Sequence, residues 1–288
     1  MSIKLEEVSY TYMPGTPYEQ TALDHISLEI EKGEFLAIIG HTGSGKSTLV
    51  QHLNGLLHPT AGRVLVDGVD LAAKTPEAKR VSRSVGMVFQ YPEHQLFAET
   101  IYEDIAFGPR NLKLDEAEVK QRVELAMEFV GLDYKKFAER SPFQLSGGQM
   151  RRVAIAGVIA MHPDYLVLDE PSAGLDPASR NAIFAEIVQL YRTRGTTVIL
   201  VTHNMEEAAR LADRMLVMAK GQVRLDGKPK EVFRADRELL HAAGVDVPRM
   251  VELVDALRRK GLSIPEDTTS VDALVREILA SQGRGPSC

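Results

Sequence analysis

Short apolar runs alternate with amphipathic segments through most of the chain. Residues 35–39, 165–168 and 196–201 are almost entirely apolar or β-branched, which predicts strands buried on both faces. Helical periodicity follows the second and third runs, over 178–194 and 205–212. Strands that alternate with helices indicate a mainly parallel sheet with helices on both sides, and therefore an α/β fold.

The segments around this pattern differ in character. The first forty residues alternate in polarity between turn signals and predict short antiparallel strands. Residues 91 to about 145 predict several short helices, which we interpret as a helical subdomain inserted into the core. Residues 214–225 predict a closing hairpin. We expect a main domain over 1–226 and a small C-terminal extension with short amphipathic helices over 227–288.

The composition argues against several classes of protein. With 44% apolar and 26% charged residues, the 288-residue chain has an ordinary globular composition. Its net charge of −6 and its lack of tryptophan argue against a nucleic-acid partner. The longest apolar stretch, 153–161, is about half as long as a bilayer span. The alternation that begins at Ile3 predicts no signal peptide. Any role at a membrane is therefore expected to depend on partner proteins.

A candidate phosphate-binding loop follows the first buried run. The sequence from Gly40 to Ser47, GHTGSGKS, fits the pattern G-x-x-x-x-G-K-[ST] and lies between a predicted strand and a predicted helix. Backbone N–H groups in such a loop, together with the positive end of the helix dipole, bind phosphate oxygens. The Lys46 side chain can reach the β- and γ-phosphates of a nucleoside triphosphate, and the Ser47 hydroxyl can bind Mg²⁺. The nucleotide-binding candidates are Gly40, Thr42, Gly43, Ser44, Gly45, Lys46, Ser47 and Thr48.

Polar side chains follow three other predicted strands. Asp169 and Glu170 come directly after the run 165–168, and His203 follows the run that ends near Thr202. The carboxyl ends of parallel strands are where α/β folds bind ligands. Asp169 can hold Mg²⁺, Glu170 can polarise the attacking water, and His203 can contact the γ-phosphate. Gln90 ends its own strand, and its amide oxygen could join the Mg²⁺ site.

A second anion site is predicted before the helix that we expect over 149–161. The sequence LSGGQ, from Leu145 to Gln149, places a serine and two glycines at a helix N-terminus. The chain thus has two phosphate-binding surfaces and one apparent nucleotide. We infer that the second surface binds the nucleotide of a partner.

Together these motifs, in this order over about residues 3–225, resemble the ATPase subunit of an ATP-binding-cassette (ABC) transporter. In that family two subunits pair head to tail, and each ATP with its Mg²⁺ lies between one phosphate loop and the partner's Ser-Gly-Gly-Gln. The resemblance implies that Ser146, Gly148 and Gln149 act in trans and that Asp176 lies at the dimer seam.

The aromatic residue that stacks on adenine in this family corresponds to Tyr12, although Tyr10 is a near competitor. The loop that follows is longer than the family usually has.

A narrower resemblance links the chain to the ATPases of energy-coupling-factor transporters. It rests on QYPEHQLF at 90–97 and TIYEDIAFGP at 100–109, while GHTG at 40–43 and QHLNGL at 51–56 favour the second of that family's two paralogues. It implies ATP-driven uptake of a vitamin or metal ion at the cytoplasmic face of the cell membrane. The implied partners are a second ATPase, identical or not, a transmembrane coupling subunit that contacts 91–97, and a substrate-binding membrane protein. The C-terminal extension would help to hold the dimer.

Two alternatives stay open at this stage. One is the ATPase of an ordinary ABC importer or exporter. The other is an ABC ATPase that acts on nucleic acid or ribosomes without a membrane partner. The second is disfavoured because the insert at 91–145 is too short for the long coiled coil of the DNA-repair type, and because the chain holds a single cassette rather than two.

Overall fold

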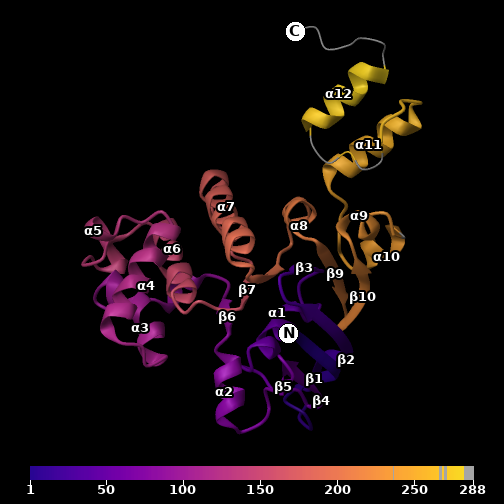
Figure 1. Ribbon diagram of the computed structural model, residues 1–288. Helices are drawn as coiled ribbons and strands as arrows, with labels where there is room; N and C mark the ends of the chain where they lie inside the picture. The colour runs from indigo at the N-terminus through magenta and orange to yellow at the C-terminus, as the bar shows by residue number, and fades with distance from the viewer. Residues whose placement is uncertain (236, 266–267, 269–270, 282–288) are drawn as a thin grey trace.

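The computed structural model describes residues 1–235, 237–265, 268 and 271–281, and it contains two sheets (Figure 1). The strands of the first are β1 (Ser2–Tyr12), β2 (Gln20–Glu31), β4 (Ala61–Val66) and β5 (Val69–Asp70). Those of the second are β3 (Phe35–Ile39), β6 (Val85–Val88), β7 (Tyr165–Asp169), β8 (Thr197–Val201), β9 (Arg214–Ala219) and β10 (Gln222–Gly227). The first sheet is antiparallel, in the order β2-β1-β4-β5, and the second has the order β10-β9-β3-β8-β7-β6. The α/β fold with antiparallel N-terminal strands is thus confirmed.

The second sheet is parallel except for the terminal β9–β10 hairpin, and its centre is buried on both faces. Every residue of β3, β7 and β8 is buried, as their apolar sequences predict. Successive residues of β7 contribute to opposite clusters, with Leu166 on the side of the helical subdomain and Val167 on the side of the antiparallel sheet. The helix α1 (Lys46–Leu53) fills the space between the two sheets through Leu49 and Leu53.

The N-terminal strands are longer than the short strands expected from the sequence. β1 and β2 have 11 and 12 residues, and their pairing continues through several register shifts. Glu7 and His25 take positive φ angles of 50° and 47° near these shifts. Such bulges interrupt the polar–apolar alternation, which makes one long strand look like two short ones in the sequence.

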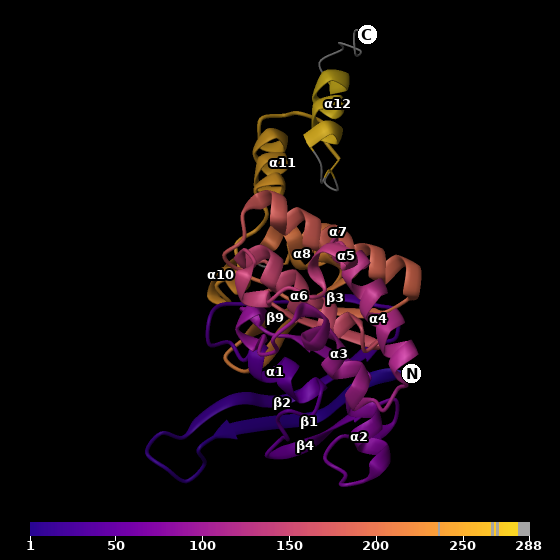
Figure 2. The same ribbon diagram turned by 90° about the vertical axis from the view of Figure 1, so that its left-hand side faces the viewer.

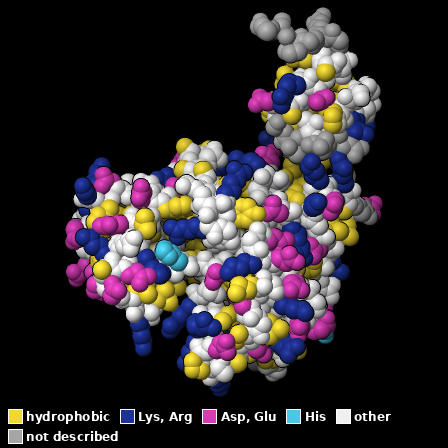
Figure 3. Space-filling model, viewed as in Figure 1, with side chains coloured by type: hydrophobic (Ala, Val, Ile, Leu, Met, Phe, Trp, Pro, Cys, Tyr) yellow, Lys and Arg dark blue, Asp and Glu magenta, His cyan; other side chains and the backbone are white. Residues whose placement is uncertain are grey.

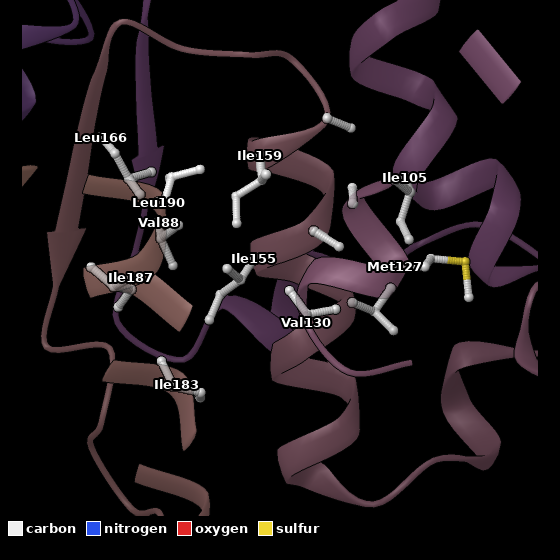
Figure 4. Close-up of a cluster of buried hydrophobic side chains, with 14 of the residues drawn as sticks. Val88, Ile105, Met127, Val130, Ile155, Ile159, Leu166, Ile183, Ile187 and Leu190 are labelled. Carbon is white, nitrogen blue, oxygen red and sulfur yellow. The ribbon is translucent and has the colours of Figure 1, made fainter. Parts of the chain in front are cut away.

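A helical subdomain lies beside the parallel sheet, as expected. It contains η1 (Pro92–Gln95), α3 (Ile101–Asn111), α4 (Glu116–Phe129), α5 (Tyr134–Phe137) and η2 (Pro142–Gln144), and it packs on α6 (Gly147–Ile159). The apolar face of α6 joins this subdomain to the sheet and to α7 (Pro177–Arg194). Figure 4 shows Ile155 and Ile159 between Ile105 and Val130 on one side and Leu166 on the other. The short α2 (Pro76–Ser82) lies next to the antiparallel sheet.

The C-terminal part has two sections. The helices α8 (Met205–Leu211), α9 (Pro229–Val232) and α10 (Arg237–Ala242) share an apolar cluster with β3 and β9. The helices α11 (Arg249–Arg259) and α12 (Val271–Ser281) project away from the body in both views and share a small cluster around Val254 and Leu274 (Figure 2). In Figure 3 this pair forms a separate lobe, and acidic and basic side chains are interspersed on the face below it.

Within the described residues, no helix has both the length and the apolar character needed to cross a bilayer.

One half-buried carboxyl in this framework lacks a full set of partners. Glu186, on α7, has its Oε2 atom buried without a hydrogen-bond partner. Burial raises the pKa of Glu186 to about 7, and the nearby Arg152 guanidinium offsets part of this effect. Between its usual pKa of 4.5 and about 7, the folded protein therefore binds a proton that the unfolded chain does not. The stability from this group is lost as the pH rises through 7.

We therefore expect Glu186→Gln to raise the free energy of unfolding at pH 8 and to change it little at pH 5. The gain should be about 1–2 kcal/mol once solvent screening of the half-buried group is allowed for. Urea unfolding of both proteins from pH 5 to pH 8 measures this difference. Glu128→Gln, at an exposed position of α4, is the matched control. Equal effects of Glu186→Gln at pH 5 and pH 8 would contradict the assignment.

Candidate nucleotide-binding site

The loops that carry the candidate residues leave one edge of the parallel sheet. In the pairing of β3 with β8, Ile38 is opposite Val201, and in the pairing of β7 with β8, Asp169 is opposite the same Val201. All three strands run in the same direction, so the phosphate loop, Glu170 and His203 follow them at that edge. The topology therefore assembles residues that are far apart in the sequence.

The phosphate loop turns sharply between β3 and α1. Gly40 has a φ of 148°, and a Cβ atom built there would lie 2.2 Å from the Met218 carbonyl oxygen, so only glycine fits. Gly43 and Gly45 also take positive φ angles, and Gly45 is the residue before α1 begins at Lys46. The Ser44 side chain is buried, whereas Thr42 and Gly43 at the tip are exposed. The loop thus offers backbone groups at the positive end of a helix.

The Lys46 ammonium lies across this loop. Its Nζ atom donates hydrogen bonds to the carbonyl oxygens of Gly40 and His41, at 2.7 and 2.9 Å. Burial lowers the pKa of Lys46, and the negative charges of Glu170 and Asp169 act in the opposite direction. Both carboxylates therefore act electrostatically on the ammonium, whose hydrogen bonds go to the loop carbonyls.

Asp169, the last residue of β7, faces the start of α1. Its side chain is 6% exposed, and burial raises its pKa, while a hydrogen bond from the Ser47 hydroxyl and the Lys46 charge lower it. A carboxylate and a hydroxyl at this contact are hard oxygen donors of the kind that Mg²⁺ prefers. The two residues therefore fit a magnesium ion that retains several water ligands.

Glu170 and His203 form the opposite side of the site. Glu170 takes a left-handed φ of 50°, and its backbone N–H donates to the Val201 carbonyl at 3.0 Å. Its Oε2 atom lies 2.7 Å from Nδ1 of His203, although the contact does not have the alignment of a hydrogen bond. The Glu170 side chain is 13% exposed and the His203 side chain 76% exposed. A shielded carboxylate thus lies beside an imidazole that can reach a ligand from solvent.

Two further candidates lie at the edges of this group. Gln90 is exposed and lies just after β6. Val88 of β6 pairs with Leu168 of β7, and Gln90 and Glu170 each lie two residues after these paired residues. The two side chains therefore belong to the same edge of the sheet. The Tyr12 hydroxyl lies 3.1 Å from the Thr48 hydroxyl of α1, which brings the Tyr12 ring close to the phosphate loop. Tyr10 packs edge-on against this ring at 4.8 Å and is less exposed than Tyr12.

The predicted second anion site lies at the start of α6. This helix begins at Gly147, two residues before the expected start at Gln149, because Ser146 caps it. The Ser146 hydroxyl accepts from the Gln149 backbone N–H at 3.4 Å, and the Gln149 side chain accepts from the Ser146 N–H at 3.1 Å. Both glycines are therefore in the first turn, where no Cβ atoms obstruct the helix end.

The two anion sites are not brought together within this chain. Figure 1 shows α6 with the helical subdomain, on one side of the sheet, and α1 between the sheets. Ser146 and Gly147 are exposed, so the start of α6 is open to a second molecule. Asp176, which accepts backbone N–H groups of Ala178 and Ser179, is likewise exposed at the start of α7. The phosphate loop and the start of α6 are each one half of a possible composite site, and we call them half-sites.

Sequence reasoning missed a buried cation that connects these regions. Arg151 of α6 is 2% exposed and forms a two-point ion pair with Glu93, at 2.9 and 3.0 Å. The same guanidinium donates to the carbonyl oxygens of Pro171 and Ala173, just after Glu170. A charge this deeply buried needs several partners, so Arg151 fixes α6, η1 and the loop after β7 to each other. An arginine on a helix face gives no such signal in the sequence.

Glu207 was missed for the same reason. It is 5% exposed and lies within 3.4 Å of the Ser172 and Thr202 hydroxyls, while its other oxygen is 3.6 Å from Arg180 Nε. Burial raises the pKa of Glu207, and the Arg180 charge opposes this. The residue therefore links the loop that follows Glu170 with the strand end that precedes His203.

Comparison with known proteins places this arrangement in a family. Residues 23–173 match the family model described as ABC transporter. The chain is 51% identical to an energy-coupling factor transporter ATP-binding protein, EcfA2, of Clostridium tetani, over 97% of this chain and 96% of that protein. It is 55% identical to the EcfA2 protein of Symbiobacterium thermophilum over 98% of each chain.

Two solved structures have the same fold. That of cbiO1 from Clostridium perfringens, described as part of the ABC transporter complex cbiONQ, has 39% identity and a TM-score of 0.72 and covers 88% of this chain and 98% of that one. A dimer of the ATP-binding cassette MJ0796 bound to ADP and Pi has 32% identity and a TM-score of 0.70, over 79% and 98%. The chain therefore belongs to the ABC transporter ATPases and, among them, to the energy-coupling factor transporter ATP-binding proteins.

Proposed function

We propose that this chain is the ATP-hydrolysing subunit of an energy-coupling factor transporter and that it powers uptake of a vitamin or metal ion. The proposed ATP hydrolysis rests on one observation: the same edge of the sheet holds Lys46, Asp169, Glu170 and His203. Membership of the family supports the transport part. An ATP hydrolysis assay on the purified chain tests the first part, and the partners recovered from membranes test the second.

In the proposed reaction a water molecule attacks the γ-phosphate in line with the leaving ADP oxygen. Glu170 polarises this water, because its carboxylate is shielded from solvent and lies beside the His203 imidazole. The Lys46 ammonium moves from the loop carbonyls to the β- and γ-phosphates and stabilises their charge, together with His203. A Mg²⁺ ion held by Ser47 and Asp169, with Gln90 nearby, would neutralise phosphate charge when bound.

The second half-site acts on a partner's nucleotide. Ser146, Gly148 and Gln149 lie at an exposed helix N-terminus that can bind a γ-phosphate presented by a second subunit. ATP then favours the closed pair, since it contacts both subunits, and hydrolysis removes the group that joins them. Tyr12 stacks on the adenine in this arrangement, next to the phosphate loop.

The segment at 91–97 transmits this motion to a transmembrane coupling subunit. Phe97 is 62% exposed and packs edge-on against the exposed Phe107 at 5.1 Å. Asp104 accepts backbone N–H groups of Phe97 and Ala98 at 3.1 and 3.2 Å, which fixes the segment. The Glu93–Arg151 pair joins it to α6 and to the loop beyond Glu170. Movement at the nucleotide therefore reaches an exposed apolar surface.

The domain limits and remaining partners follow from the same proposal. The ATPase domain covers 1–226 and the extension 227–288, in which α11 and α12 help to hold two ATPase subunits together. The partner ATPase is a sister chain or a second copy, and the coupling subunit serves a substrate-binding membrane protein that selects the cargo. The complex lies at the cytoplasmic face of the membrane, and no nucleic acid takes part.

Replacing the proposed general base should separate binding from turnover. Glu170→Gln removes the negative charge and preserves the shape, so we expect ATP hydrolysis to fall by about 10²-fold or more while ATP affinity is retained. Light scattering should then detect a dimer that persists with ATP. Turnover at the wild-type rate would contradict the role given to Glu170.

The lysine of the loop should matter for binding itself. Lys46→Ala removes the ammonium group proposed to bind the β- and γ-phosphates. Calorimetry should therefore show at least a tenfold weaker affinity for ATP. Lys79→Ala, at an exposed position of α2, should bind as the wild type does. Unchanged affinity in Lys46→Ala would exclude the proposed phosphate site.

The action in trans can be tested without disturbing the helix. Aspartate and asparagine both cap helices as well as serine does, but only aspartate repels a phosphate. We expect Ser146→Asp to bind ATP normally as a monomer and to lose ATP-dependent dimerisation and turnover, with Ser146→Asn affected much less. Equal behaviour of the two variants would argue against a phosphate at this helix end.

A further inference from the structure

The helix α10 ends in a turn that touches the phosphate loop. Gly244 has a φ of 65°, its N–H donates to the His241 carbonyl, and the Val245 N–H donates to the Leu240 carbonyl. These two bonds define a Schellman motif, which satisfies the carbonyl groups near the end of the helix. The carbonyl of the capping residue, Ala243, remains available to another partner.

That partner is the phosphate loop. The His41 backbone N–H donates to the Ala243 carbonyl oxygen at 3.1 Å. The turn is also in steric contact with the loop, because a Cβ atom built on Gly244 would lie 2.7 Å from the His41 Cβ. A backbone bond and a close packing contact therefore join residues about two hundred positions apart in the sequence.

Buried apolar side chains hold the turn in place. Leu240, Ala243 and Val245 are 1–3% exposed and belong to the apolar cluster that includes Ala37 and Ile39 of β3, the strand that leads into the phosphate loop. The α10 turn and the loop thus rest on the same strand. Because buried apolar contacts hold the turn, it can keep the loop in place before ATP binds.

The same loop peptide is also held by Lys46. The lysine donates to the carbonyl oxygens of Gly40 and His41, whereas Ala243 receives the N–H of His41. Binding of a triphosphate requires the ammonium to turn toward the phosphates and to release those carbonyls. The bond to Ala243 does not compete with phosphate, so it can restrain the loop in both states.

We propose that the Ala243–Gly244 turn is a positioning element of the nucleotide site, which holds the His41 peptide so that the phosphate loop is preorganised for ATP. This inference rests on the proposed binding of ATP by the loop. It adds to the site, in cis, the segment between α10 and α11, which lies outside the part matched by the family model. The turn affects ATP through the loop and does not touch the reacting atoms.

The chain contains its own control for this proposal. Gly261 ends α11 in the same motif, with a φ of 88° and bonds from the Gly261 and Leu262 N–H groups to Arg258 and Leu257, but a Cβ atom there would meet nothing within 4 Å. Gly244→Ala and Gly261→Ala therefore both carry left-handed backbone strain, which is no smaller at Gly261 because its φ lies further from the left-handed minimum. Only Gly244→Ala pushes on the phosphate loop.

Calorimetric titration of the full-length variants with ATP and Mg²⁺ tests the proposal. We expect Gly244→Ala to raise the Kd and the KM for ATP about tenfold with little change in kcat, and Gly261→Ala to behave as the wild type in both. Adding His41→Gly to Gly244→Ala removes the clash and should recover most of the affinity. Equal Kd values for Gly244→Ala and Gly261→Ala would overturn the proposal. Failure of the wild type to bind ATP would instead overturn the proposed function.

Amide hydrogen exchange tests the same contact in the wild-type protein, so the result does not depend on whether a variant folds. The His41 N–H should exchange slowly in the nucleotide-free wild type, since it is bonded to Ala243. Exchange of that amide at the rate of an unprotected loop would contradict the contact on which the inference depends.

Discussion

The parallel pairing of three buried strands is the constraint on which the site depends. β3 lies beside β8 and β8 beside β7, all in one direction, so the residues after them leave the sheet at a single edge. Lys46, Glu170 and His203 are far apart in the chain and meet only because these apolar strands pair. Pairing of the strands thus gathers charge at this edge, where the negative charges of Glu170 and Asp169 oppose the lowering of the Lys46 pKa by burial.

Much of this arrangement could be predicted from local sequence. The apolar runs identified β3, β7 and β8 because strands buried on both faces need apolar side chains at every position. The phosphate loop and the LSGGQ segment could be recognised because glycine, lysine and serine are required there by backbone geometry and charge. The same reasoning predicts that the second anion site binds the nucleotide of a partner, which stays a prediction.

The remaining features depend on tertiary contacts that leave no periodic signal. Arg151 and Glu207 are charged residues on helices, and burial makes them important only because distant backbone and side-chain groups surround them. The lengths of β1 and β2 were underestimated because bulges interrupt their alternation. The contact of Ala243 with His41 joins two backbones, so side-chain identities could not indicate it, apart from the glycine that allows the close approach.

In the proposed function this chain supplies ATP-driven motion to a membrane transporter as one of two paired ATPases. The most direct test is to recover the chain from detergent-solubilised native membranes and to identify the accompanying proteins by mass spectrometry. We expect an ABC ATPase partner, an integral coupling protein and a small substrate-binding membrane protein, whose identity would indicate the cargo. Recovery with a soluble binding protein and ordinary permeases, or with ribosomal or DNA-bound proteins, would contradict it.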